Sequence, residues 1–100
     1  MDVVSVLKKI KPQLENEGFM IDGIVGSYAY GDHTAASDVD ILYHVDETFV
    51  RKHHGFATFS RIAEIKQLLA EKLHKEVDLI ASRGLSETAK KYMLSRVLNV

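Results

Sequence analysis

The sequence has 100 residues, of which 46% are hydrophobic and 27% are charged, and its formal net charge is −1. This length and composition are typical of a folded protein with one core, so we expect a single domain over residues 1–100. The sequence lacks cysteine, a basic footprint and any apolar run of about 18 residues, which argues against a disulfide scaffold, direct nucleic-acid binding and a membrane span. We therefore expect a cytoplasmic protein.

The first predicted element is a helix over residues 2–17, where apolar side chains recur at helical spacing. Asp2 is suited to cap its N-terminus, and Gly18 is suited to end it. Pro12 lies inside this segment and removes a backbone hydrogen bond. We therefore expect the helix to be kinked or divided near residues 8–11, where that bond is lost.

Two predicted strands follow, at residues 19–25 and 39–45, both rich in aliphatic and β-branched side chains. Gly23 inside the first strand indicates a bulge. The residues between the two strands are polar and contain glycine, which predicts a loop.

The second half begins with a helix over residues 56–74, followed by a short strand at 77–81 and a last helix that begins near Ser86. The apolar stripe of the first helix consists of Phe59, Ile62, Ile65, Leu69 and Leu73. The side of the last helix that we expect to be buried consists of Leu85, Ala89, Tyr92, Met93 and Val97. This order of elements predicts an α/β fold of the α+β kind, a small mixed sheet with helices packed on it.

Two aspartates, Asp38 and Asp40, lie one residue apart at the second predicted strand. Side chains alternate along a strand, so both carboxylates face one side, with Cα atoms about 6.6 Å apart. Two such charges repel by roughly 3 kcal/mol, and a cation would remove this cost. Mg²⁺ commonly binds one or two carboxylates together with substrate phosphates. If the strand at 77–81 lies beside this one, Asp78 adds a third carboxylate, and the trio could hold two metal ions for an in-line displacement at phosphorus.

A short glycine-bearing loop, "GSYAYG", follows the first predicted strand. Its backbone amides could hold a phosphate. Gly26 leaves room for a close approach, and the hydroxyl of Ser27 can donate to a phosphate oxygen. The sequence contains neither a P-loop motif nor a dinucleotide-binding glycine fingerprint, which excludes those two kinds of nucleotide site.

The pattern Gly26-Ser27, ten intervening residues and Asp38-Val39-Asp40 resembles the signature of the DNA polymerase beta nucleotidyltransferase superfamily. The short chain and Asp78 on a later strand are similar to its minimal nucleotidyltransferase branch, whose members are often antitoxin partners of HEPN-domain toxins. The resemblance implies a polymerase-beta-like palm and an enzyme that transfers AMP from ATP to a hydroxyl of a partner protein, with pyrophosphate leaving. By the same resemblance, Gly26 and Ser27 would bind the triphosphate of ATP. Asp38, Asp40 and Asp78 would be catalytic and would hold two Mg²⁺ ions.

One position departs from this pattern. Many members carry arginine where this chain has Tyr30, so a cation that could assist phosphate binding is absent from the loop. Arg83, or a nearby lysine, could replace it. Tyr30 also favours an alternative function, a binding module that neutralises a toxin by occlusion with little or no catalysis.

Other interpretations remain open at this point. The two aspartates of the second strand could be a solvent-facing pair, or they could serve a metal-dependent phosphohydrolase that releases inorganic phosphate. The adjacent pair His53-His54 lacks a third ligand at helical spacing and is interpreted as part of a loop. Leu94 and Leu98 could form an interface between copies of the chain, so a homo-oligomer is also considered.

Overall fold

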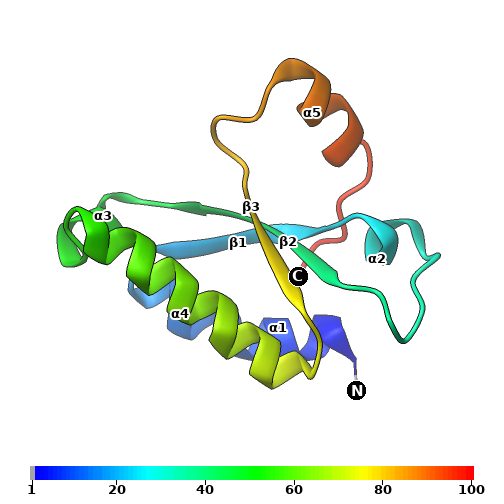
Figure 1. The fold of residues 1–100 in the computed structure, drawn as a ribbon, viewed down its shortest axis with the longest axis horizontal. Coiled ribbons are helices and arrows are strands. Elements are labelled where there is room, and N and C mark those ends of the chain that lie inside the picture. The colour runs from blue at the N-terminus through cyan, green and yellow to red at the C-terminus, as the bar shows by residue number, and fades with distance from the viewer. Residues whose placement is uncertain (1) are drawn as a thin grey trace.

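The computed structural model describes residues 2–100, and Figure 1 shows its fold. The elements are α1 (Val3–Asn16), β1 (Phe19–Val25), α2 (Ser27–Tyr30), β2 (Val39–Val45), α3 (Glu47–Lys52), α4 (Phe56–Leu73), β3 (Val77–Ala81) and α5 (Glu87–Met93). All three predicted strands are confirmed at their predicted bounds. The α+β fold class is confirmed as well.

The sheet has the strand order β1-β2-β3. β1 and β2 are antiparallel, whereas β2 and β3 are parallel, so α3 and α4 form the crossover that a parallel pair requires. The register of β1 against β2 shifts between Ile21 and Gly23, which confirms the predicted bulge. The outer edge of β1 is met by the end of the chain, where the backbones of Ile24 and Leu98 exchange hydrogen bonds of 2.9 and 2.8 Å.

The core lies between one face of the sheet and the helices α1 and α4, which run side by side beneath it in Figure 1. Asp2 caps α1 as predicted, since its side chain accepts a hydrogen bond from the N–H of Val4. The predicted division near residues 8–11 does not occur, because α1 is one helix from Val3 to Asn16 with Pro12 inside it. Its buried side chains lie on both sides of the proline, and their burial offsets the lost hydrogen bond.

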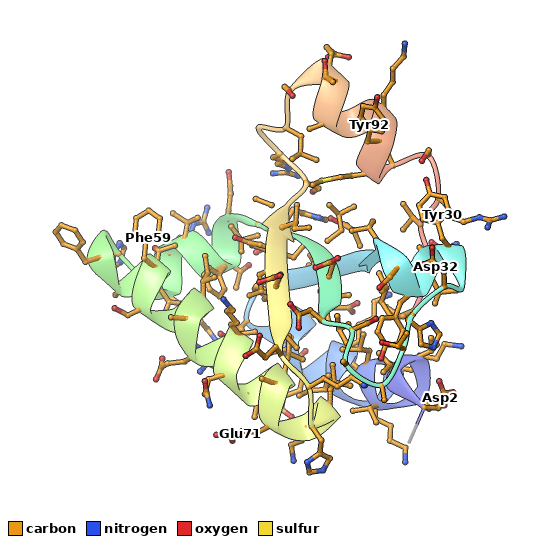
Figure 2. The ribbon with its side chains drawn as sticks, turned by 45° about the vertical axis from the view of Figure 1, so that its right-hand side comes forward. Asp2, Tyr30, Asp32, Phe59, Glu71 and Tyr92 are labelled. Carbon is orange, nitrogen blue, oxygen red and sulfur yellow. The ribbon has the colours of Figure 1, made fainter. Side chains whose placement is uncertain are left out.

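Two expected packing faces are corrected. Phe59 is 72% exposed, because the first turns of α4 extend past the sheet and the fully buried stripe begins at Ile65. The last helix, α5, has no buried residue, and it ends at Met93, before Val97. It rises on the side of the sheet opposite α1 and α4, and Tyr92 is 76% exposed on it (Figures 1 and 2).

The short helix α3 was not among the expected elements. It begins after Asp46, whose side chain accepts a hydrogen bond of 3.2 Å from the N–H of Phe49. The ring of Phe49 is fully buried and anchors the helix to the core beside Phe19. Within residues 2–100, no helix has the length and apolar character that crossing a membrane requires.

Candidate active site

The parallel pairing of β2 and β3 places Asp40 directly opposite Asp78. Side chains of residues that are opposite in a sheet lie on the same face. Val39 and Ile41, on either side of Asp40, are fully buried in the core beneath the sheet. The carboxylates of Asp40 and Asp78 therefore lie on the other face, away from α1 and α4, as the alternating pattern predicts.

Asp40 sits in an environment that opposes its negative charge. Burial is the largest cause that raises the pKa of its carboxyl group, followed by the charges of Asp78 and Asp38 and a hydrogen bond with Asp78. The three acidic groups therefore act on one another. An electrostatic cost of this kind is relieved when a cation binds among the carboxylates.

Asp38 lies outside the strand, in the loop immediately before β2, and its side chain is exposed. Within residues 2–100, no group of three histidine, aspartate or glutamate side chains is arranged to hold a metal ion. The structure therefore brings Asp40 and Asp78 together and leaves Asp38 at the rim. The donors still fit a divalent cation chemically, because they are carboxylate oxygens that repel one another.

Gly26 lies against Asp40. Its φ of +75° is a backbone conformation that glycine adopts readily, and a Cβ built at this position would overlap the Oδ2 of Asp40. The carbonyl of Gly26 accepts hydrogen bonds from the N–H groups of Ala29 and Tyr30, at 3.0 and 3.2 Å, and so starts α2. Ser27 is the first residue of α2 and follows directly. The predicted phosphate loop and the carboxylate pair are therefore neighbours.

The loop between α2 and β2 is held by several local contacts. The N–H of Thr34 donates to the hydroxyl of Ser37 at 2.8 Å, and the Nζ of Lys75 donates to the carbonyl of Ala35 at 2.9 Å. The rings of Tyr28 and His33 are stacked with centroids 4.0 Å apart. These contacts fix the path of the chain from Ser27 to Asp38.

Tyr30 binds the end of the chain. Its hydroxyl is 2.6 Å from the hydroxyl of Ser95, and the guanidinium of Arg96 lies over its ring at 5.6 Å. Sequence reasoning missed these two partners, because no local pattern relates residues so far apart in the chain. Arg83, by contrast, lines a groove beside α3, at the opposite end of β2 from Asp40.

A second polar pair lies further along the face that carries Asp40. The Nδ1 of His44 is 2.8 Å from the Oδ1 of Asp22, which projects from the bulge of β1. The sequence offered no specific signal for this pair, since neither residue belongs to a recognisable motif. The contact fixes the orientation of the His44 ring and helps to pair the two strands.

The fold and the neighbouring glycine and carboxylates define a small nucleotidyltransferase. Residues 23–98 match the nucleotidyltransferase domain family, and the chain belongs to that family. A solved structure described as "Structure of putative minimal nucleotidyltransferase" superposes with a TM-score of 0.71 over 100% of this chain and 97% of the other, at 21% identity. This last likeness concerns the fold.

Two proteins of Methanocaldococcus jannaschii, both named "Putative protein adenylyltransferase", are similar in sequence. One is 30% identical over 86 residues, which are 84% of this chain and 79% of the relative. The other is 28% identical over 100% of this chain and 99% of the relative. Both matches extend over most of each chain.

Proposed function

We propose that this protein transfers AMP from ATP to a hydroxyl group of a partner protein. The observation that carries the proposal is the position of Gly26 against Asp40, with Asp78 opposite Asp40 on the next strand. A phosphate held at Gly26 would lie beside this carboxylate pair. The names of the two relatives support the same reaction.

In this proposal the backbone of Gly26 and the hydroxyl of Ser27 bind the phosphates of ATP. Asp78 is exposed, and its carboxylate accepts a hydrogen bond from the hydroxyl of the acceptor protein. This bond orients the hydroxyl oxygen, and the carboxylate then takes up the hydroxyl proton. That oxygen forms a bond to the α-phosphorus, the bond from the α-phosphorus to the bridging oxygen breaks, and pyrophosphate leaves. Two Mg²⁺ ions bound through Asp38, Asp40 and Asp78 would supply the charge neutralisation that these phosphates need.

The acceptor that we propose belongs to a second protein. Resemblance to the minimal nucleotidyltransferases favours a toxin of the HEPN class, modified on a tyrosine. Within residues 2–100, one observation supports a separate acceptor protein: Asp78 is exposed to solvent, so a hydroxyl from outside the chain can reach its carboxylate.

The position of the label from ATP tests this reaction. ATP labelled at the α-phosphate should leave its label on the acceptor protein, whereas ATP labelled at the γ-phosphate should release it as pyrophosphate. Release of the γ-label as inorganic phosphate by the purified protein would contradict transfer and would favour a phosphohydrolase.

The contacts of Tyr30 favour a second candidate function. The resemblance leads us to expect a phosphate-binding arginine at this position of the loop, and the chain instead has a tyrosine whose hydroxyl contacts Ser95. In that case the protein neutralises a toxin by covering its surface. Two results together would favour occlusion. The partner would bind without nucleotide with the same affinity to the wild type and to Asp38→Asn combined with Asp40→Asn, and the wild type would transfer no label.

A further inference from the structure

The outer edge of β3 is unpaired. In the sheet order β1-β2-β3 it is the last strand, and no segment of residues 2–100 pairs with its outer side. At the other end of the sheet, β1 forms one isolated pairing, between Ile24 and Leu98. The outer edge of β3 has no pairing at all within residues 2–100, and this strand carries Asp78.

The backbone groups that face this open edge follow from the pairing of β3 with β2. The carbonyl of Glu76 accepts from the N–H of Val39 at 3.0 Å, and the N–H of Ser82 donates to the carbonyl of Tyr43 at 2.8 Å. Backbone groups of successive residues alternate between the two sides of a strand. The groups that point away from β2 therefore belong to Val77, Leu79 and Ala81.

A groove of about 390 Å³ lies along this edge, between β3 and α4. Small side chains of α4, Ala63 and Ala70, line one wall, so a backbone can approach closely. Lys66 stands in the same groove, and no ion pair of Lys66 is found within residues 2–100. The groove is therefore bounded by the unpaired edge of β3 and by small side chains of α4, and it contains the positive charge of Lys66.

We infer that the acceptor protein docks here as an added strand: an extended segment pairs with the open edge of β3 and presents its hydroxyl to Asp78. This inference rests on the proposed function. A strand beside β3 places the residue opposite Asp78 on the same face as the carboxylates, with its Cβ about 5 Å from that of Asp78. The hydroxyl-bearing residue of the acceptor is the one in register with Asp78.

The charges favour an acceptor segment over a second copy of this chain. Two copies paired through β3 would bring Glu76 and Asp78 of one copy close to the same acidic residues of the other, and like charges on neighbouring strands destabilise pairing. Lys66 belongs to α4, beneath the sheet, so it favours an acidic residue directly beside the hydroxyl-bearing residue, where alternation turns the side chain toward α4 and away from Asp78. The partner is therefore an extended segment with a tyrosine, serine or threonine and an acidic residue next to it.

Amide hydrogen exchange measured by NMR tests whether a peptide docks on the open edge of β3, and it does so independently of AMP transfer. The probes are short synthetic peptides with β-branched residues around one central tyrosine, flanked by glutamate in one set and by lysine in the other. Without ATP, the glutamate set should slow exchange at the amides of Leu79 and Ala81. Binding that leaves these two amides unprotected, or stronger binding of the lysine set, would overturn the inference.

Two variants add a second readout. Ala81→Pro removes one N–H from the open edge, where proline is tolerated, and should weaken peptide binding about tenfold. Ala81→Val retains the N–H and should bind within about threefold of wild type. Lys66→Ala should weaken binding of the glutamate set, whereas Lys72→Ala, an exposed lysine of α4 outside the groove, should not. Unchanged binding by Ala81→Pro and Lys66→Ala together would refute the docking edge.

The two proposals fail in different ways. Peptides that protect β3 and receive no AMP would refute the transferase and retain the docking edge. AMP transfer to a peptide that leaves β3 unprotected would refute the edge alone. Sedimentation of the wild type as a dimer that Ala81→Pro converts to a monomer would assign the edge to a second copy and overturn the inference.

Discussion

Gly26 and Asp40 are in such close contact across the pair of β1 and β2 that a side chain on Gly26 would overlap the carboxylate of Asp40. The position of the carboxylate therefore depends on the absence of a Cβ at residue 26. Gly26 therefore leaves space for the carboxylate of Asp40, in addition to the phosphate-binding role that we propose for it.

Gly26→Ala should displace Asp40 and lower transferase activity about 100-fold. The φ of +75° with a ψ of −147° should also cost the variant about 1–3 kcal/mol of unfolding free energy, because this conformation is essentially restricted to glycine. Gly31→Ala is the control for a positive φ without a steric overlap, because Gly31 has a φ of +78°, a ψ of 10° and no atom within 4 Å of a built Cβ. Equal activity loss in the two variants, measured beside denaturant unfolding, would contradict the role of the Gly26–Asp40 contact.

Asp40→Asn should stabilise the metal-free protein by about 1 kcal/mol, because it removes repulsion from Asp78 and Asp38. We expect Mg²⁺ to raise the melting temperature of the wild type and to leave that of Asp40→Asn unchanged. Thermal unfolding with EDTA and with Mg²⁺ measures both effects. Asp32→Asn, an exposed aspartate of the loop outside the carboxylate pair (Figure 2), is the control and should respond to Mg²⁺ like the wild type.

The ion pair between Glu17 and Arg61 should make stability depend on pH. Arg61 donates two hydrogen bonds to Glu17, at 2.7 and 2.8 Å, and this lowers the pKa of Glu17 below its ordinary value of 4.5. A carboxyl whose pKa is lower in the folded state stabilises the protein above the unfolded pKa, and the contribution disappears as the pH falls through the folded pKa. Glu17→Gln should therefore cost about 1–3 kcal/mol at pH 7 and much less in acid.

Urea unfolding of Glu17→Gln at several pH values tests this sign. Glu64→Gln is the matched control, since Glu64 lies 3.7 Å from Arg61 but is 66% exposed, and it should change stability little. A deficit of Glu17→Gln that grows as the pH falls below 4.5 would contradict the assignment.

Tyr30→Phe should loosen the end of the chain and leave the fold intact. The variant loses the hydrogen bond to Ser95 but keeps the ring beneath Arg96. Because Tyr30 is half exposed, we expect a loss below about 1 kcal/mol in global stability and faster amide exchange at Leu98. Unchanged exchange at Leu98 would show that the hydroxyl contact does not hold this segment.

The strands and the carboxylate pair could be predicted because alternation in a strand has a fixed period. Once the segment at 77–81 pairs with the one at 39–45, Asp40 and Asp78 lie on one face by geometry alone. The pair Gly26-Ser27 and its spacing to Asp38-Val39-Asp40 indicated the family. The proximity of Gly26 to the carboxylate of Asp40 could not be predicted, because it depends on how the loop enters α2.

The helices were predicted less well, because an apolar stripe does not tell how far a helix extends past the sheet. Phe59 continues the stripe of Ile62 and Ile65 by spacing, yet it lies beyond the core and is exposed. The contact of Tyr30 with Ser95 could not be predicted from the sequence, because it connects two segments that are far apart in the chain through two hydroxyl groups.

The most direct test of the transferase is mass spectrometry of a candidate acceptor protein of the HEPN class, after coexpression with this chain and incubation with ATP and Mg²⁺. We predict that the wild type adds one or more AMP units to this protein and that Asp38→Asn combined with Asp40→Asn adds none. A complex that forms with wild type and carries no added AMP would contradict transfer and would favour occlusion.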